Sequence, residues 1–216
     1  MTQLERVELE LEEAVAVLAQ RSSLMADFYR NYGLPRLYRD SFDPGRSGGH
    51  TEQDAFGFLV ETLVYQQLSG SSARAILERL DAATGLQAET VAVLTPEELR
   101  RIGLSGPKIK TLDRLCRSVS AAQLSQLASL DDASVRAFIE GLYGFGSWSA
   151  DMFLMFHLQR FDIWPVGDLA MRRSVQRHLS GSVPLLLPEL IEHGDQYRPF
   201  RSLAAWYFWA DDHAQA

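Results

Sequence analysis

Asp168 is the residue whose type and setting best suit chemistry. It ends the segment Trp164-Pro-Val-Gly-Asp168, in which Pro165 and Gly167 predict a tight turn, and a helical pattern begins directly after it. The plain interpretation is a helix N-cap, a role that aspartate fills well. The alternative is a carboxylate exposed at a cleft, where it can stabilise positive charge or activate water. The sequence alone leaves both interpretations open.

A glycine turn, Gly144-Phe145-Gly146, precedes this aspartate and joins two helical patterns. Glycines permit a left-handed backbone and close approach of another group, and Phe145 between them can plug the core. The next helix would begin with N–H groups that suit a phosphate. The bland interpretation is an αα-hairpin with a glycine C-cap. The segment from Gly103 to Gly106 has the same layout.

The composition restricts the class of protein. The chain has 216 residues, of which 46% are hydrophobic and 23% charged, so extensive disorder is excluded. The single cysteine, Cys116, excludes an internal disulfide and a cysteine-rich zinc or iron–sulfur site. No apolar run approaches the length of a transmembrane helix. The acidic start is not a secretory signal, so we expect a cytoplasmic protein.

The net charge of −7 argues against a nucleic-acid partner, but the charge is unevenly spread. Residues 5–13 hold five glutamates and one arginine, whereas residues 99–118 hold six basic residues and one aspartate. The basic stretch is either a solvated helix face or a DNA-facing surface. We expect Arg100, Lys108, Lys110 and the Gly144–Gly146 turn to share one face, with the glutamates away from it.

Helical periodicity dominates the chain, and no run alternates as a strand would, so the fold class is all-α. We expect helices near 4–30, 55–67, 69–80, 96–102 and 152–158, and a long loop over 32–50. The domain hypothesis is an N-terminal helix and loop over 1–50, packing on a helical core over 51–216. The helix-hairpin-helix is expected at about 134–158.

Four stretches together resemble the helix-hairpin-helix DNA glycosylases, and most closely their 3-methyladenine DNA glycosylase II branch. They are LVYQQLSGSSARAILERL, LRRIGLSGPKIKTLDRLC, LYGFGSWSADMFLMFHLQRFDIWPVGD and YRPFRSLAAWYFW, in the family's order over about residues 55–210. The resemblance implies two helical subdomains flanking a cleft, without an N-terminal α/β domain. It implies a monofunctional enzyme of base excision repair that flips and hydrolytically excises alkylated purines.

The resemblance also assigns roles. Asp168 would be the catalytic carboxylate, and Gln67, with Leu68 beside it, would fill the gap that the flipped base leaves in the DNA. Trp148, Trp209, Met152 and Leu169 would line the base pocket. The backbone-binding residues would be Gly144, Phe145, Gly146, Ser147, Ser149, Gly103, Ser105, Gly106 and Lys108. The alternatives without a role in DNA binding are that Gln66 and Gln67 are only polar helix-end residues. Trp148 and Trp209 would then pack in the core.

The partner would be double-stranded DNA containing damaged bases, bound by a monomer. No cofactor is expected, apart from a monovalent cation that the hairpin carbonyls would hold. Asp151, Asp162, His157 and His178 are interpreted as structural. Arg198 and Arg201 would either support the pocket or pair with an acid.

This chain departs from the family's pattern at several places. Tyr143 and Phe145 stand where the family often has proline and isoleucine or valine. Trp148 replaces the lysine nucleophile of the lyase branches, so no lyase activity is expected. Met152 and Leu169 stand where some relatives have tyrosines. The alternatives are a glycosylase for deaminated or oxidised bases and a non-catalytic helix-hairpin-helix DNA-binding protein.

Overall fold

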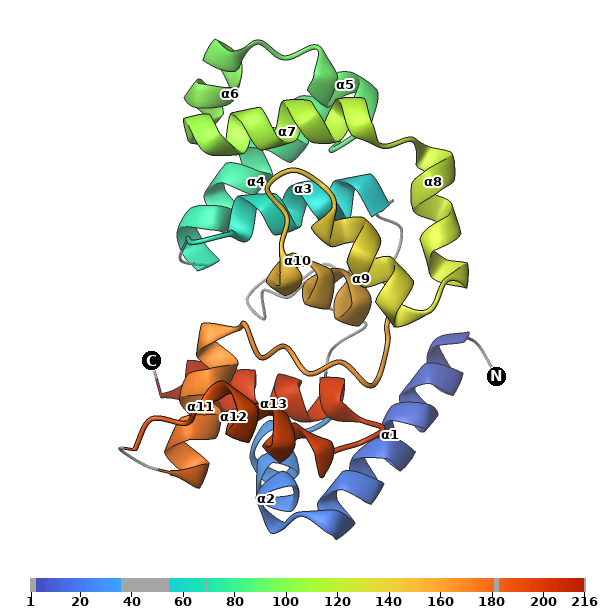
Figure 1. The fold of residues 1–216 in the computed structure, drawn as a ribbon, viewed down its shortest axis with the longest axis vertical. Coiled ribbons are helices and arrows are strands. Elements are labelled where there is room, and N and C mark those ends of the chain that lie inside the picture. Colours follow the sequence, from blue (N-terminus) through green and yellow to red (C-terminus); the bar gives the residue numbers. More distant parts are fainter. Residues whose placement is uncertain (1–2, 36–54, 69, 181–182, 216) are drawn as a thin grey trace. The chain divides into compact units, whose positions relative to one another are not determined.

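The computed structural model describes the chain apart from residues 1–2, 36–54, 69, 181–182 and 216, so most of the predicted 32–50 loop lies outside the described residues. Every regular element in the described part is a helix, which confirms the all-α prediction (Figure 1). None of these helices is long and apolar enough to span a membrane. The chain divides into two compact units, Met1–Asp40 with Gln159–Ala216, and Ser41–Leu158.

The Ser41–Leu158 unit is built around α3 (Ala55–Tyr65), in which every residue is buried. Because neighbours surround it, α3 is apolar around almost its whole circumference rather than along one stripe. The helices that contact it include α4 (Gly70–Thr84), α7 (Gly106–Ser118), α8 (Ala121–Gln126) and α10 (Ser147–Met152). The others are α5 (Ala88–Ala92), α6 (Pro96–Ile102) and α9 (Asp132–Glu140).

Local capping signals explain where several helices begin and end. The predicted helix 96–102 is confirmed as α6, with Thr95 and Glu98 forming a reciprocal capping box and Gly103 ending it in the left-handed region. The helix expected over 55–67 stops earlier, at Tyr65, because Gln67 adopts a left-handed φ of 58°.

The prediction of a regular α-helix over 152–158 is corrected, because the backbone there has a wider turn. After α10 the backbone widens into a π-type turn, Phe153–His157, closed by a 2.9 Å bond from the Leu158 N–H to the Phe153 carbonyl. The ring of Phe153 packs edge-on against Phe58 of α3 and lies against His157. His157 is therefore part of an aromatic cluster, whereas the sequence analysis predicted only a structural role for it.

The other unit joins both ends of the chain. It contains α1 (Gln3–Arg21), α2 (Ser23–Tyr32), α11 (Leu169–Leu179), α12 (Leu187–Asp195) and α13 (Arg201–Ala214), and α13 packs on α11 and α2. Tyr207 of α13 is buried and donates to the Gly33 carbonyl at 2.9 Å, which ties the N-terminal segment to α13. The single helix expected over 4–30 is wrong, because Ser22 breaks it and caps α2 through the Met25 N–H.

Candidate functional site

Asp168 combines an N-cap with a second hydrogen bond. The turn before it closes with a 2.9 Å bond from the Asp168 N–H to the Pro165 carbonyl. Its Oδ1 accepts the Met171 N–H at 2.9 Å, which caps α11. The same oxygen accepts the indole N–H of Trp209 at 2.7 Å. Two donors that converge on one oxygen fix the orientation of a half-exposed carboxylate.

Trp209 is brought to Asp168 because α13 is tied to α11 by a charged network. Asp212 of α13 accepts from Arg173 at 2.5 Å and from Arg177 at 2.8 Å. Asp211 accepts from Ser174 at 2.7 Å and pairs with Arg177 and His178. Burial alone would raise the pKa of Asp212, but the hydrogen bonds from the two arginines outweigh it and lower that pKa. The network keeps these carboxylates ionised between the two helices.

The glycine hairpin in the other unit has the predicted local structure. Gly144 has a φ of 83°, and a Cβ there would overlap the side chain of Thr111 on α7. Phe145 is buried, as expected for a plug, and its N–H bonds to the Leu142 carbonyl at 3.1 Å. Gly146 is the extended N-cap of α10, whose first turn presents backbone N–H groups. Ser147, next to it, is exposed.

Gln66 was missed as a site residue and connects α3 to the hairpin. Its side-chain amide donates to the Gly144 carbonyl and to the Ser149 hydroxyl, both at 3.1 Å. Ser149 is buried, so its hydroxyl lies inside this contact. The sequence signal was a polar residue at the end of an otherwise apolar helix.

Lys108 completes the same connection from α7. Its ammonium donates to the carbonyls of Val64 at 2.7 Å and Gln66 at 2.8 Å, at the C-terminal end of α3. Burial lowers the pKa of this ammonium. The structure therefore gives Lys108 a structural contact with α3. We name Lys108, Gln66, Gly144 and Ser149 the brace.

The turn that the brace supports carries the predicted gap-filling residues. Gln67 has a left-handed φ of 58° and an exposed side chain, and Leu68 is 40% exposed. A non-glycine residue in this region carries backbone strain, which the surrounding structure must stabilise. Gly103, at the other predicted turn, also adopts a positive φ of 117°, and Ser105 and Gly106 beside it are exposed.

The predicted pocket residues differ in exposure. Trp148 on α10 and Trp209 on α13 are both half-buried. Met152 is buried at 1% exposure, whereas Leu169 is 67% exposed. The two units of the chain contribute two of these residues each, and their lining of a common pocket stays a prediction.

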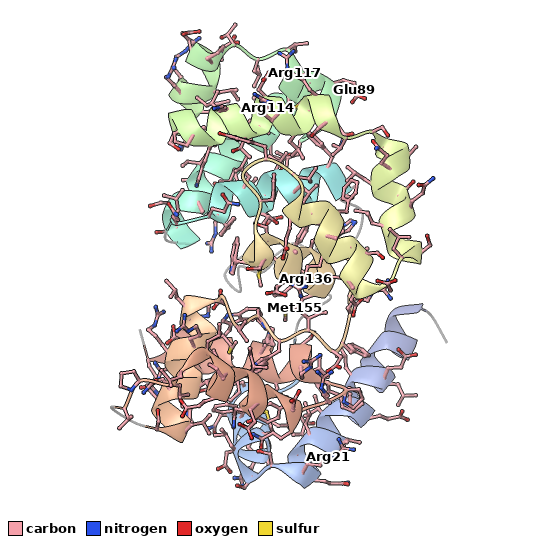
Figure 2. All side chains as sticks on the ribbon, viewed as in Figure 1. Arg21, Glu89, Arg114, Arg117, Arg136 and Met155 are labelled. Carbon is pink, nitrogen blue, oxygen red and sulfur yellow. The ribbon has the colours of Figure 1, made fainter. Side chains whose placement is uncertain are left out.

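The remaining predicted polar residues form ion pairs. Arg201 and Arg198 pair with Asp162 at 2.7 and 2.9 Å. Of the two roles expected for these arginines, this is pairing with an acid rather than support of the pocket. Buried Asp151 pairs at 2.6 Å with Arg136, which comes from α9 (Figure 2). Asp151 therefore links the two helices of the hairpin.

The basic stretch is only partly available to a ligand. Arg100 pairs with Glu97 and Arg117 with Asp113, and Lys108 belongs to the brace. Lys110 does lie at the hairpin, since its ammonium is 5.1 Å from the centre of the Tyr143 ring. The N-terminal glutamates belong to the other unit, so their distance from this face stays a prediction.

A cavity of about 760 Å³ lies in the Ser41–Leu158 unit and is lined by residues such as Ala92, Cys116 and Leu124. No predicted site residue lines it, so the chemistry is not assigned to it. Among the described residues, no cluster of three or more histidine, cysteine, aspartate or glutamate side chains could hold a metal ion.

Comparisons with known proteins bear on both units. Residues 60–183 match the family described as HhH-GPD superfamily base excision DNA repair protein. DNA-3-methyladenine glycosylase 1 of Schizosaccharomyces pombe is 26% identical over 93% of this chain and 90% of its own length. Two further curated relatives are longer, and the chain spans 65% and 52% of their lengths.

Solved structures show the same architecture. The DNA-3-methyladenine glycosidase of Bacillus halodurans superposes with a TM-score of 0.71 at 26% identity, over 95% of this chain and 91% of that one. The 3-methyladenine DNA glycosylase of S. pombe in complex with abasic DNA superposes with a TM-score of 0.68 at 24% identity, over 73% and 80% of the two chains.

Proposed function

Since the chain belongs to the HhH-GPD superfamily of base excision DNA repair proteins, we propose that it is a monofunctional DNA glycosylase. It hydrolyses the bond between deoxyribose and an alkylated purine of the 3-methyladenine type in double-stranded DNA. The names of the S. pombe and B. halodurans proteins support this substrate class. The DNA complex of the S. pombe enzyme supports duplex DNA as the partner.

The observation that carries the proposal is the fixed carboxylate of Asp168. It lies within the segment that matches the family, and its Oδ1 is held by the Met171 and Trp209 N–H groups. Cleavage of the N-glycosidic bond builds oxocarbenium character on the sugar, which a carboxylate stabilises electrostatically. An alkylated purine already carries positive charge and leaves easily, so one carboxylate suffices.

The other predicted residues have roles in this scheme. The target nucleotide leaves the duplex at a cost of a few kcal/mol, and Gln67 with Leu68 fills the vacated stack. The Gly144–Gly146 hairpin and the Gly103–Gly106 turn hold the DNA backbone through N–H groups. Trp148 and Trp209 present aromatic faces, which attract a cationic base.

The reaction needs water and no cofactor in this proposal. Trp148 stands where a lyase would need a lysine, so the product is an abasic site with an intact strand. A monovalent cation at the hairpin carbonyls stays a prediction, and no step of this scheme uses one. The enzyme acts as a monomer in the cytoplasm, on the nucleoid.

Replacing Asp168 with asparagine tests the mechanism. Asparagine keeps the cap on α11, because it accepts the same N–H bond, but it removes the negative charge. We expect the single-turnover rate of 3-methyladenine release from methylated duplex to fall by about 10²–10³-fold, with an unchanged melting temperature.

The matched control is Asp131→Asn, which alters the N-cap aspartate of α9 in the same way. It should leave the rate of release unchanged. An Asp168→Asn variant that releases 3-methyladenine at the wild-type rate would contradict the proposed mechanism. If a panel of duplexes instead shows release of hypoxanthine or 8-oxoguanine and no alkylated purine, the substrate class is wrong. Binding without any release would favour the non-catalytic alternative.

A further inference from the structure

Tyr143 is a departure from the family's pattern that has no role in the proposed function. It directly precedes Gly144 in the hairpin, and half of its side chain is exposed. The ammonium of Lys110 lies 5.1 Å from the centre of its ring, and the guanidinium carbon of Arg114 lies 5.6 Å from it. Both cations lie within the range of a cation–π interaction.

The two cations come from one face of α7. Positions 110 and 114 are one helical turn apart, so both side chains point the same way, and Arg114 is exposed on this helix (Figure 2). We name Lys110, Arg114 and Tyr143 the hairpin cation cluster. The ring holds two long side chains together that would otherwise repel each other.

The cluster keeps its positive charge. An aromatic ring attracts cations through its quadrupole but carries no net charge to neutralise them. In the part of the chain that the structure describes, neither Lys110 nor Arg114 forms an ion pair with a carboxylate. Asp113, on the same helix, pairs instead with Arg117 at 2.8 Å. Two charges next to the hairpin therefore remain for an anionic ligand.

The ammonium of Lys108 is not open to an anionic ligand in the way that the two cations of the cluster are. Its ammonium is engaged by the carbonyls of Val64 and Gln66 in the brace. We propose that the hairpin cation cluster binds a phosphate of the DNA backbone next to the phosphate that the hairpin holds. The inference rests on the proposed function in taking duplex DNA as the ligand and in placing a backbone phosphate at the hairpin.

The salt dependence of DNA binding tests this inference. The probe is a duplex with one tetrahydrofuran abasic-site analogue, which no glycosylase can hydrolyse. Each phosphate contact adds about 0.9 to the magnitude of the slope of log Kd against log salt concentration. We expect the double variant Lys110→Gln/Arg114→Gln to lower that magnitude by about 0.9, and each single variant by less. Between 50 and 200 mM salt, the double variant should then lose about 3.5-fold less affinity than the wild type.

Arg117→Gln is the matched control, since Arg117 is an exposed arginine on α7 outside the cluster. It should leave the slope unchanged. Tyr143→Phe, which keeps a ring face, should retain the wild-type slope, and Tyr143→Leu should lower its magnitude. All these side chains are exposed or half-exposed, so the fold should survive in each variant, as circular dichroism would verify.

Two outcomes would overturn the inference. The first is an unchanged slope in the double variant. The second is an equal change of slope in Arg117→Gln, which would mean that the overall positive charge of α7 acts on the DNA rather than a defined site.

Failure of the proposed function would be seen separately. Excision of alkylated purines by the wild type is measured with saturating enzyme, independently of the salt slopes. A chain that releases no base but shows the expected slopes would refute the glycosylase proposal and leave the phosphate site standing.

Discussion

The N-cap and the proposed catalytic role of Asp168 are compatible, because one geometry serves both. The Met171 N–H fixes Oδ1 through the helix, and the Trp209 indole fixes it through tertiary packing. A carboxylate that is already oriented loses little entropy when charge develops near it. In the proposed scheme Trp209, which we expected to line the base pocket, is thus also a positioning residue.

Trp209→Phe separates these two roles. Phenylalanine keeps an aromatic face but cannot donate to Asp168. A hydrogen bond to a charged group contributes about 1.5–3 kcal/mol, so we expect kcat for alkylated-purine release to fall by about 10–100-fold with little change in KM.

The control is Trp206→Phe, on the same helix, where the ring packs against Tyr207. It should change neither kinetic constant. If Trp209→Phe raised KM and left kcat intact, the indole would act by stacking on the base and not by orienting the carboxylate.

At the scale of elements, the brace determines how three segments meet. Lys108 of α7 bonds to the end of α3, and Gln66 at that end bonds to the hairpin. The left-handed Gln67 follows directly, so its strained turn is held between two contacts. The brace connects the turn that carries the predicted gap-filling residues to the hairpin, and in the proposed function both engage one duplex.

Lys108→Met should uncouple the gap-filling turn from the hairpin. Methionine fills similar space but leaves the Val64 and Gln66 carbonyls without their donor, which should cost about 1–3 kcal/mol of unfolding free energy. Affinity for the abasic-analogue duplex should fall in parallel. Urea unfolding and a binding titration measure the two effects.

Lys108→Arg should recover part of both losses, because a guanidinium can also donate to two carbonyls. Lys110→Met, an exposed lysine on the same helix, should leave stability unchanged. Wild-type stability in Lys108→Met would show that the two carbonyl contacts contribute nothing measurable.

For the whole molecule, the net charge of −7 is a poor guide to its partner. Much of the basic stretch over 99–118 is neutralised locally or buried in the brace. Lys110 and Arg114 remain at the hairpin. A protein that must scan and release DNA needs only a local cationic face.

The stability of the whole fold should depend on pH through His193. Burial lowers its pKa to about 4, whereas an unfolded histidine titrates near about 6.5. Between these values the unfolded chain binds a proton that the folded chain does not. The free energy of unfolding should therefore decrease as the pH falls through this window, by about 1–2 kcal/mol between pH 6.5 and 5.

Urea unfolding across this pH range checks the effect. His193→Gln should flatten this part of the profile, and His213→Gln, at an exposed position, should not. Parallel profiles for the wild type and His193→Gln would contradict the assignment.

The sequence by itself determined what is encoded locally. Helical periodicity predicted the all-α class, the helix over 96–102 was predicted and is α6, and glycines and prolines placed the hairpin and the Asp168 turn. Periodicity did not reveal the break at Ser22 or the π-type turn after Met152. The first depends on one serine cap, and in the second the ring of Phe153 packs against Phe58.

Only the tertiary structure decided the partners of the site residues. Trp209 and Asp168 are 41 positions apart in the sequence, Lys108 and Gln66 are 42 apart, and Gln66 and Gly144 are 78 apart. No periodicity or motif records which donor meets which acceptor over such separations, because packing of whole helices brings them together. The sequence therefore predicted which residues carry chemistry, and the fold determined which partners hold them in place.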